Sequence, residues 1–316
     1  MPPVDRNKPK RAASSESQYS LMEFMAEFPD DASCLEWLWR TRYSRDGEHA
    51  YCPSPSCKTE RTFKRYATSQ QRQSWTCTTC GKHLHPTAGT IFHKSSTSLH
   101  LWFYGMYLMT STRCGISAKQ LERELGVTYK TAWRMMNLIR NQLMTQGDVD
   151  RMTGEVEVDE TYVGGKPREY PKRSKEWHRQ RKATVLGMVE RGGRVRAEHI
   201  PFAGAGDIQP RVTDVVKAGS VLYTDEAGVY EALGHRYFHK AIKHVEHVER
   251  VYVSGDVHTQ TIEGFLSTLK NGLRGTYHAV SKRWLQGYLN EYVWRYNHRD
   301  DDLGTFRLLL LRAAIA

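Results

Sequence analysis

Four of the chain's six cysteines fall into two close pairs, and this spacing restricts what the first part of the chain can form. The first pair, Cys52 and Cys57, forms the ends of the segment CPSPSC, and the second pair, Cys77 and Cys80, forms the ends of CTTC. Between the two pairs lie 19 residues. Such knuckles let four thiolates surround one Zn²⁺ ion, which stabilises a small module that has little core. Six cysteines in 316 residues do not make a secreted disulfide framework. The pairs therefore predict a structural zinc ribbon in a reducing compartment, with a hairpin between them.

The other cysteines and two nearby histidines stand in less specific surroundings. Cys34 and Cys114 are isolated in the sequence, and we expect both to be packed thiols. His83 and His85 follow the second cysteine pair and are alternative ligands for the same ion. We expect these histidines to face solvent or a bound polyanion instead.

The charge balance indicates the kind of partner. Lys and Arg number 46 against 35 Asp and Glu, which gives a formal charge of +11. Such a charge favours nucleic acid over an anionic membrane, although many soluble proteins are simply basic. No stretch reaches the roughly 18 apolar residues that a spanning helix needs, and the N-terminus lacks the apolar core of a secretory signal. We therefore expect a cytoplasmic protein that does not bind membranes.

The stretch from residue 115 to residue 143, GISAKQLERELGVTYKTAWRMMNLIRNQL, predicts two short helices joined by a tight turn at Gly126. Apolar residues are spaced to pack these helices together: Leu121, Leu125, Val127, Ala132, Trp133, Met136 and Ile139. Other residues remain for the outer surface: Lys119, Arg123, Tyr129, Lys130, Thr131 and Arg134. A second helix that begins at Thr128 would present its first turn to the major groove of DNA. A helical hairpin that serves only for packing is the alternative.

Beyond residue 150 the sequence becomes β-branched, alternating and punctuated by glycine, which predicts strands. Asp159 ends the alternating run EVEVD, Asp225 ends the apolar run VLYTD, and Glu263 opens a predicted helix. Carboxylates at the ends of adjacent strands project at one edge of a sheet, where a third from a nearby helix completes a cluster. Because like charges repel, such a cluster requires a cation, and Mg²⁺ prefers oxygen ligands. Two such ions can promote an in-line displacement at phosphorus. The alternative to a metal site is that the three acids are merely solvated residues at the ends of strands.

Other acidic residues compete for these roles. Glu157 points to the same face as Asp159 if the strand is regular, whereas Glu160 and Glu226 point away from their neighbours. Asp256 is a further candidate.

Basic residues near the acids suit a phosphate backbone. Lys270 lies seven residues after Glu263, on the same face of the predicted helix, and Arg274 follows just past its end. The run from residue 166 to residue 182, KPREYPKRSKEWHRQRK, is either a mobile DNA-binding loop or a solvated linker, and its Tyr170 and Trp177 could stack on bases. In the later segment WRYNHR we expect helix-terminal structural contacts from Arg295, Asn297 and Arg299.

In their order along the chain, these motifs resemble the ISXO-type transposases of bacterial insertion sequences. The cysteine pairs are followed by GTIF, ISAKQLERELGVTYKTAWRMM, EVDETYVGGK, YTDE, GDVHTQTIEGFLSTLK and GTYHAVSKRWLQGYLNEYVWRYNHR. The resemblance extends from Phe28 to Arg299. The chain departs from the family pattern in its C-x4-C knuckle, where the family has C-x2-C. It departs again at Gln260 and Leu266, where the family has asparagine and an aromatic residue.

The resemblance implies a ribonuclease H-like catalytic domain with a DDE triad of Asp159, Asp225 and Glu263 that holds Mg²⁺ or Mn²⁺. It implies cleavage at the ends of an insertion sequence, followed by attack of a 3′-hydroxyl on target DNA. The zinc ribbon and the helix-turn-helix would recognise the terminal inverted repeats, and the enzyme would act as a homo-oligomer on double-stranded DNA. The resemblance also implies that the protein is bacterial and associated with the nucleoid. A non-catalytic DNA-binding regulator and a nuclease that cuts without joining remain alternatives.

The expected fold class is multidomain α+β. We expect a disordered tail over residues 1–20, a helical segment over 21–50, the zinc ribbon over 51–95 and the helical region with the helix-turn-helix over 96–147. A ribonuclease H-like α/β domain with a mixed central sheet is expected over 150–300 and a C-terminal tail over 301–316. Because a metal-held carboxylate stays ionised, we expect metal chemistry that is insensitive to pH near neutrality. DNA affinity should fall steeply with salt.

Overall fold

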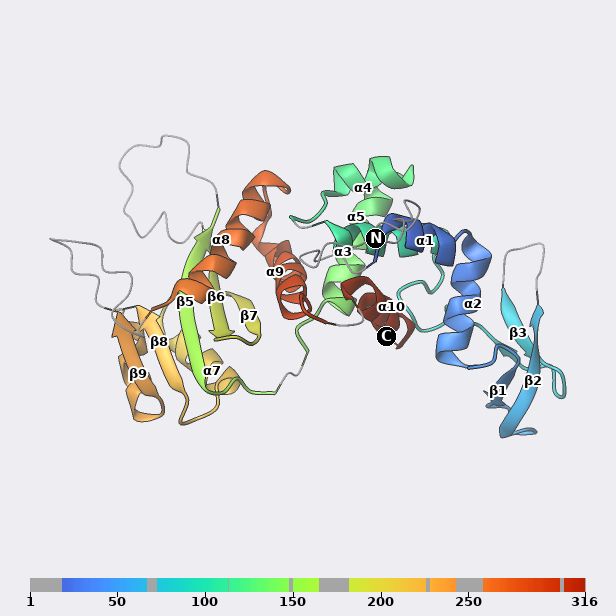
Figure 1. The fold of residues 1–316 in the computed structure, drawn as a ribbon, viewed down its shortest axis with the longest axis horizontal. Helices are drawn as coiled ribbons and strands as arrows, with labels where there is room; N and C mark the ends of the chain where they lie inside the picture. Colours follow the sequence, from blue (N-terminus) through green and yellow to red (C-terminus); the bar gives the residue numbers. More distant parts are fainter. Residues whose placement is uncertain are drawn as a thin grey trace, which may run out of the picture. The chain divides into compact units, whose positions relative to one another are not determined.

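The structure is a computed structural model that describes residues 19–66, 73–112, 114–147, 150–164, 182–225, 228–242, 258–301 and 304–315. The chain forms two compact units, and Figure 1 shows their helices and strands. The first unit contains Met1–Ser111 and His298–Ala316, and the second contains Thr112–Asn297. Among the described residues, no helix has both the length and the apolar character needed to cross a bilayer.

The first unit combines helices with a small antiparallel sheet. Its helices are α1 (Leu21–Glu27), α2 (Asp31–Arg42), α3 (Leu99–Ser111) and α10 (Thr305–Ile315). Its strands are β1 (His49–Cys52), β2 (Thr59–Tyr66), β3 (Ser74–Cys77) and β4 (His83–Leu84), paired in that order. The hairpin of β2 and β3 occupies the gap between the two cysteine pairs, as the spacing predicts.

Aromatic side chains hold the first unit together. The rings of Trp39 in α2 and Trp75 in β3 stack with centroids 4.7 Å apart, which joins the helical part to the sheet. Phe306 in α10 packs against Phe24 and Phe28, with centroids 5.7 Å and 6.3 Å away. The segment expected as a C-terminal tail therefore contains a helix that belongs to this core.

The second unit begins with α4 (Ala118–Leu125) and α5 (Tyr129–Leu138), and a π-helical turn (Ile139–Leu143) continues α5. The strands that follow are β5 (Glu155–Val163), β6 (Ala183–Glu190), β7 (Val195–Ile200), β8 (Val221–Asp225) and β9 (Phe238–Ile242). The remaining helices are α7 (Ala205–Val215), a 3₁₀ segment (Gly228–His235), α8 (Gln260–Gly275) and α9 (Lys282–Asn297).

The five strands form one mixed sheet in the order β7-β6-β5-β8-β9. The β5–β6 and β6–β7 pairs are antiparallel, whereas β5 pairs with β8, and β8 with β9, in parallel. This is the mixed central sheet expected of a ribonuclease H-like domain, and together with the cysteine-bearing sheet of the first unit it confirms the expected fold class.

Helices cover both faces of this sheet, as Figure 1 shows for α7 and α8. Val156 and Val158 of β5 are buried on the face covered by α7. Val185 and Val189 of β6 are buried on the other face, against α8 and α9. Because side chains alternate along a strand, the residues of β5 between its valines face α8. The sheet therefore places Glu157 and Asp159 on the α8 side.

Candidate active site

Asp159 and Asp225 lie level with each other on two neighbouring strands. β5 and β8 run in parallel with Glu157 opposite Tyr223, so the residues two positions further on reach the same part of the sheet. Glu263 lies in the first turn of α8, the helix that packs on this face of β5 and β6. Its carboxylate accepts a hydrogen bond of 2.8 Å from the hydroxyl of Thr259. The three predicted acids thus come from two adjacent strands and one covering helix.

These acids act on one another electrostatically. Burial, and after it the negative charges of Glu160, Asp225 and Glu263, together raise the pKa of Asp159 to about 7. Asp159 without a metal is therefore partly protonated at neutral pH, and metal uptake must displace that proton. The expected insensitivity to pH near neutrality concerns carboxylates that hold a metal, and it stays a prediction.

The chemistry of these side chains fits a hard divalent cation. Carboxylate oxygens are the ligands that Mg²⁺ takes, and a positive ion would relieve the mutual repulsion at Asp159. Within the described residues, however, the triad does not form a group whose ligand atoms all lie within 4.8 Å, as the cysteines do. A cation would have to draw the three side chains together.

The competing acids have other partners or lie outside the described residues. Glu157 does face the same side as Asp159, but it is fully buried and bonded to the start of α8. Glu160 accepts a hydrogen bond of 2.5 Å from the hydroxyl of Tyr230, which packs on the α7 side of the sheet, so it points away from Asp159 as predicted. Residues 226 and 256 lie outside the described residues, as does the charged run of residues 166–181 with its two aromatic side chains.

Lys270 and Arg274 follow Glu263 along α8. Lys270 is half-buried, and Arg274 is exposed in the last turn of the helix rather than just beyond it. Both are cations on the helix that carries the third acid, which suits a phosphate backbone that passes along α8.

The cysteine cluster, defined as Cys52, Cys57, Cys77 and Cys80, has the geometry of a metal site. Its four sulfur atoms all lie within 4.8 Å of one another, and the sulfurs of Cys52 and Cys80 are 3.5 Å apart. A backbone N–H from Lys82 lowers the pKa of Cys80 to about 6, whereas burial raises that of Cys52 to about 12. Four converging sulfurs fit a tetrahedral Zn²⁺ ion, which would hold all four as thiolates.

Each knuckle turns at the residue that follows its second cysteine. Lys58 follows Cys57 with a φ of 44°, and Gly81 follows Cys80 with a φ of 71°. This left-handed conformation lets the chain bend back so that both sulfurs of a knuckle point inward. The longer first knuckle therefore makes the same turn as the second, although it places a lysine where glycine is favoured.

The two histidines after the second knuckle and the two cysteines outside the cluster differ in their surroundings. His83 binds the hydroxyls of Ser74 and Thr76 through Nδ1, and neither His83 nor His85 belongs to the cysteine cluster. Cys34 is a packed thiol, as expected. Cys114 is exposed, so the prediction of a packed thiol there is wrong. The backbone carbonyl of Cys114 accepts hydrogen bonds from the hydroxyls of Thr276 and Tyr292.

The predicted helix-turn-helix is present as α4 and α5. Gly126 ends α4 in the left-handed conformation, with a φ of 63°, and Thr128 caps α5. Most of the predicted packing residues are buried, and Val127 and Trp133 are half-buried. The residues left for the outside are exposed except for Thr131, which is half-buried: Lys119, Arg123, Tyr129, Lys130 and Arg134.

The helix-turn-helix is anchored within the second unit by contacts that the sequence patterns did not reveal. The ring of Trp133 in α5 meets that of Trp284 in α9 edge-on, with centroids 5.0 Å apart. Arg140, just past α5, forms an ion pair with Glu291 of α9, and both side chains are buried. Glu291, an acid beside apolar residues of α9, signalled a buried charge, but nothing in the sequence indicated Arg140 as its partner.

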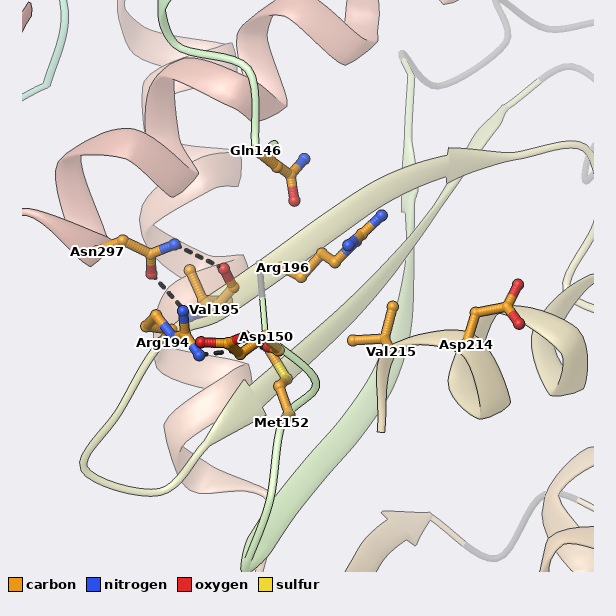
Figure 2. Close-up of a pocket in the computed structure, with 9 residues that line it drawn as sticks. All are labelled: Gln146, Asp150, Met152, Arg194, Val195, Arg196, Asp214, Val215 and Asn297. Carbon is orange, nitrogen blue, oxygen red and sulfur yellow. Dashed lines mark hydrogen bonds between the residues drawn. The ribbon is translucent and has the colours of Figure 1, made fainter. Parts of the chain in front are cut away.

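Figure 2 shows a small polar pocket in the second unit, bounded by the start of β7, the end of α7 and the end of α9. Asn297 closes one side with two hydrogen bonds to the backbone of Val195, and Arg194 donates to the carbonyl of Asp150. Asn297 and Arg295, which binds Glu291, make the structural contacts expected of them. Arg299 pairs with its neighbour Asp300. None of the triad residues lines the pocket, so it is separate from the candidate active site.

Comparisons with known proteins bear on the whole arrangement. The ISXO2-like transposase domain matches residues 151–297, which contain the sheet, α7, α8 and α9. A protein of the transposable element ISH50 from Halobacterium salinarum, described as uncharacterized, is 30% identical over 260 residues. That alignment covers 78% of this chain and 84% of the relative. The chain belongs to the ISXO2-like transposase family.

Membership of the ISXO2-like family confirms the resemblance found in the sequence. The relative is archaeal, so the expected bacterial origin has no support from it. Two solved structures, the Mos1 strand transfer complex and a pre-cleavage Mos1 transpososome, share 11% and 10% identity with this chain. Each covers 64% of this chain and 78% of the solved chain with a TM-score of 0.21, a likeness too low to support a conclusion.

Proposed function

We propose that this protein is a DNA transposase that cleaves the ends of its own element and joins them to target DNA. Asp159, Asp225 and Glu263 are the metal-binding triad, and Mg²⁺ or Mn²⁺ is the cofactor. The observation that carries the proposal is the placement of acids on β5, β8 and α8, where the charges of Asp225 and Glu263 help burial to raise the pKa of the partly buried Asp159 to about 7. A carboxylate with only a structural role is not stabilised by burial among negative charges, whereas the charge of a metal ligand is neutralised by the bound ion.

Each residue then has a defined task. Two divalent ions held by the triad would supply activation of the attacking oxygen and stabilisation of the leaving one. Asp159 would hold the metal in its deprotonated form, and Glu263 is oriented by its hydrogen bond from Thr259. Lys270 and Arg274 hold the DNA backbone along α8.

The remaining parts of the chain bind DNA and stabilise the enzyme. The exposed side chains of α4 and α5, with Lys130 and Arg134 foremost, contact the terminal repeat. The cysteine cluster holds a structural Zn²⁺ ion, and the ribbon assists in recognition of the repeat. The enzyme works as a homo-oligomer on paired ends, in the cytoplasm and on the nucleoid.

The test is cleavage and joining of a labelled duplex that carries the terminal repeat of the element, in the presence of Mg²⁺. Wild type is compared with Asp159→Asn, Asp225→Asn and Glu263→Gln, and Glu155→Gln serves as the control because it changes an exposed acid at the start of the same strand. We expect wild type and the control to cut and join, and the three variants to bind DNA but do neither.

Two other outcomes would overturn the proposal in different ways. Cutting without joining by the wild type would indicate a nuclease. DNA binding without cutting, with any divalent metal, would indicate a regulator built from the ribbon and the helix-turn-helix.

A further inference from the structure

The helix that carries Glu263 begins without a cap of its own. The side chain of its N-cap residue, Thr259, accepts no hydrogen bond from the first-turn backbone N–H groups of α8 and instead donates to the carboxylate of Glu263. The first-turn amides of a helix need acceptors, and leaving them unbonded in a buried position costs free energy. The acceptor here comes from a distant part of the chain.

That acceptor is the carboxylate of Glu157 in β5. Its Oε2 atom accepts from the backbone N–H groups of Thr261 at 2.9 Å and Ile262 at 3.0 Å. Its Oε1 atom accepts from the hydroxyl of Thr261 at 3.1 Å. A negative charge at a helix N-terminus is also favoured by the helix dipole. Glu157 therefore caps α8 from the strand beneath it.

The charge of Glu157 is balanced by one arginine that also holds the segment before α8. Glu157 is fully buried, and the Nε atom of Arg191 donates to its Oε1 atom at 2.8 Å. The Nη2 atom of the same arginine donates to the backbone carbonyl of His258 at 2.8 Å. Because a buried carboxylate is costly unless it is paired and fully hydrogen-bonded, these contacts define one position for the start of α8.

This link connects the first and third acids of the triad. Glu157 lies two residues before Asp159 on the same face of β5, and Ile262, which it binds, immediately precedes Glu263. We propose that Glu157 is a positioning residue that fixes the start of α8 against β5 and so sets the separation of Asp159 and Glu263. The inference rests on the proposed function, since it concerns how the metal ligands are arranged. Glu157 itself is not a metal ligand, because both of its oxygens are already engaged.

The neighbouring strand is shaped to admit α8 at the same point. Gly187 of β6 pairs with Asp159, and a Cβ atom there would lie 2.8 Å from the Cδ1 atom of Ile262. The helix thus packs closely on the sheet beside Asp159, near the point where Glu157 holds it.

The test separates the position of α8 from the activity of the enzyme. Hydrogen–deuterium exchange measures how fast the backbone amides of Thr261 and Ile262 exchange. Electron paramagnetic resonance measures Mn²⁺ binding to the full-length, zinc-loaded protein without DNA. The variants are Glu157→Ala, which removes the cap, and Glu157→Gln, which keeps the shape and one acceptor oxygen. Glu155→Gln is the control, because Glu155 also contacts Arg191, at 3.2 Å, and has no bond to α8.

We expect faster exchange at both amides in Glu157→Ala and about a tenfold loss of Mn²⁺ affinity, as for other groups that orient metal ligands. Glu157→Gln should show a smaller change in both measurements, and Glu155→Gln should resemble wild type. A thermal melt checks that each variant is folded. A Glu157→Gln protein that is folded and exchanges faster, yet binds Mn²⁺ as wild type does, would overturn the inference.

The same experiment distinguishes this inference from the proposed function. If Mn²⁺ binds to wild type and is lost in Asp159→Asn but not in either Glu157 variant, only the positioning role fails. If wild type does not bind Mn²⁺, or Asp159→Asn binds it unchanged, the proposed metal site itself fails and the inference falls with it.

Discussion

The Nε atom of Arg140 lies 2.7 Å from the Oε2 atom of Glu291, and neither side chain has appreciable contact with solvent. Arg140 continues the second helix of the helix-turn-helix, and Glu291 lies in α9, which packs against the central sheet. The other oxygen of Glu291 accepts from Arg295 at 2.7 Å, and the hydroxyl of Tyr277 lies 3.2 Å from both oxygens. The two helices that we propose to contact DNA are therefore built into the same unit as the three proposed metal-binding acids.

Removal of one partner from this buried pair should be severe. Glu291→Ala removes the carboxylate that accepts from both Arg140 and Arg295, so we expect a loss of about 3–5 kcal/mol in the free energy of unfolding, measured with denaturant. The control is Glu198→Ala, which breaks partly exposed pairs with Arg196 and Arg211 and should cost less than about 1 kcal/mol. Equal losses in the two variants would show that the buried pair has no special role.

The raised pKa of Asp159 predicts how stability depends on pH. A carboxyl group whose pKa is about 7 in the folded protein and 3.8 otherwise binds its proton more tightly when folded. Stability should therefore fall as pH rises between these values, by up to about 4 kcal/mol in all. Thermal melts from pH 5 to pH 8 without added Mg²⁺ should show this slope in the difference in stability between wild type and Asp159→Asn. Saturating Mg²⁺ should abolish it, and a slope that is unchanged in Asp159→Asn would assign the effect to another group.

Two glycines near the site should respond oppositely to substitution. Gly187→Val inserts atoms where Ile262 already packs, so we expect a loss of about 1–3 kcal/mol. Gly264→Ala, on the open side of α8, meets no atom within 4 Å and should gain roughly 0.5–1 kcal/mol from helix propensity. Chemical denaturation measures both, and a harmless Gly187→Val would mean that α8 can shift away from β6.

Some of these features could be predicted from the sequence and others could not, for physical reasons. The alternation of Val156 and Val158 with Glu157 and Asp159 is local, so it correctly predicted which side chains share a face. It could not show what lies over that face, and the capping of α8 by Glu157 therefore emerged only from the structure. The turn at Gly126 was predictable because a left-handed residue favours glycine.

Long-range pairings left weaker signals. Arg140 and Glu291 are separated by 151 residues, and the sequence does not encode their meeting in any periodic pattern. The burial of α10 depends on aromatic partners in α1, which is why its segment was expected to be a tail. The exposure of Cys114 was missed because its backbone, rather than its thiol, makes the contacts.

The cysteine cluster should bind one Zn²⁺ ion per chain. Cys77→Ser removes a ligand from a buried position, so we expect loss of the metal and of protection in β1 to β3, with the second unit still folded. Cys114→Ser, which changes an exposed thiol outside the cluster, should retain the metal. Metal analysis and hydrogen exchange provide the comparison, and full retention of zinc by Cys77→Ser would exclude the four-sulfur site.

The exposed cations of α5 should make DNA binding dependent on salt. Lys130→Ala removes one of the proposed phosphate contacts, so affinity should fall for all DNA sequences and the slope of log K against log salt should decrease in magnitude by about one. Lys217→Ala, an exposed lysine just after α7, is the matched control and should leave the slope unchanged. Equal effects of the two substitutions would indicate general charge attraction rather than a surface on α5.

The contribution of α10 to the first unit has a consequence for synthesis of the protein. The second unit, Thr112–Asn297, is complete in sequence before α10 leaves the ribosome, whereas the first unit must wait for Phe306 to fill the space beside Phe24 and Phe28. The part of the chain that is made first is therefore the last to finish folding. Translation that stops after α9 would yield a folded second unit attached to an N-terminal unit that lacks part of its core.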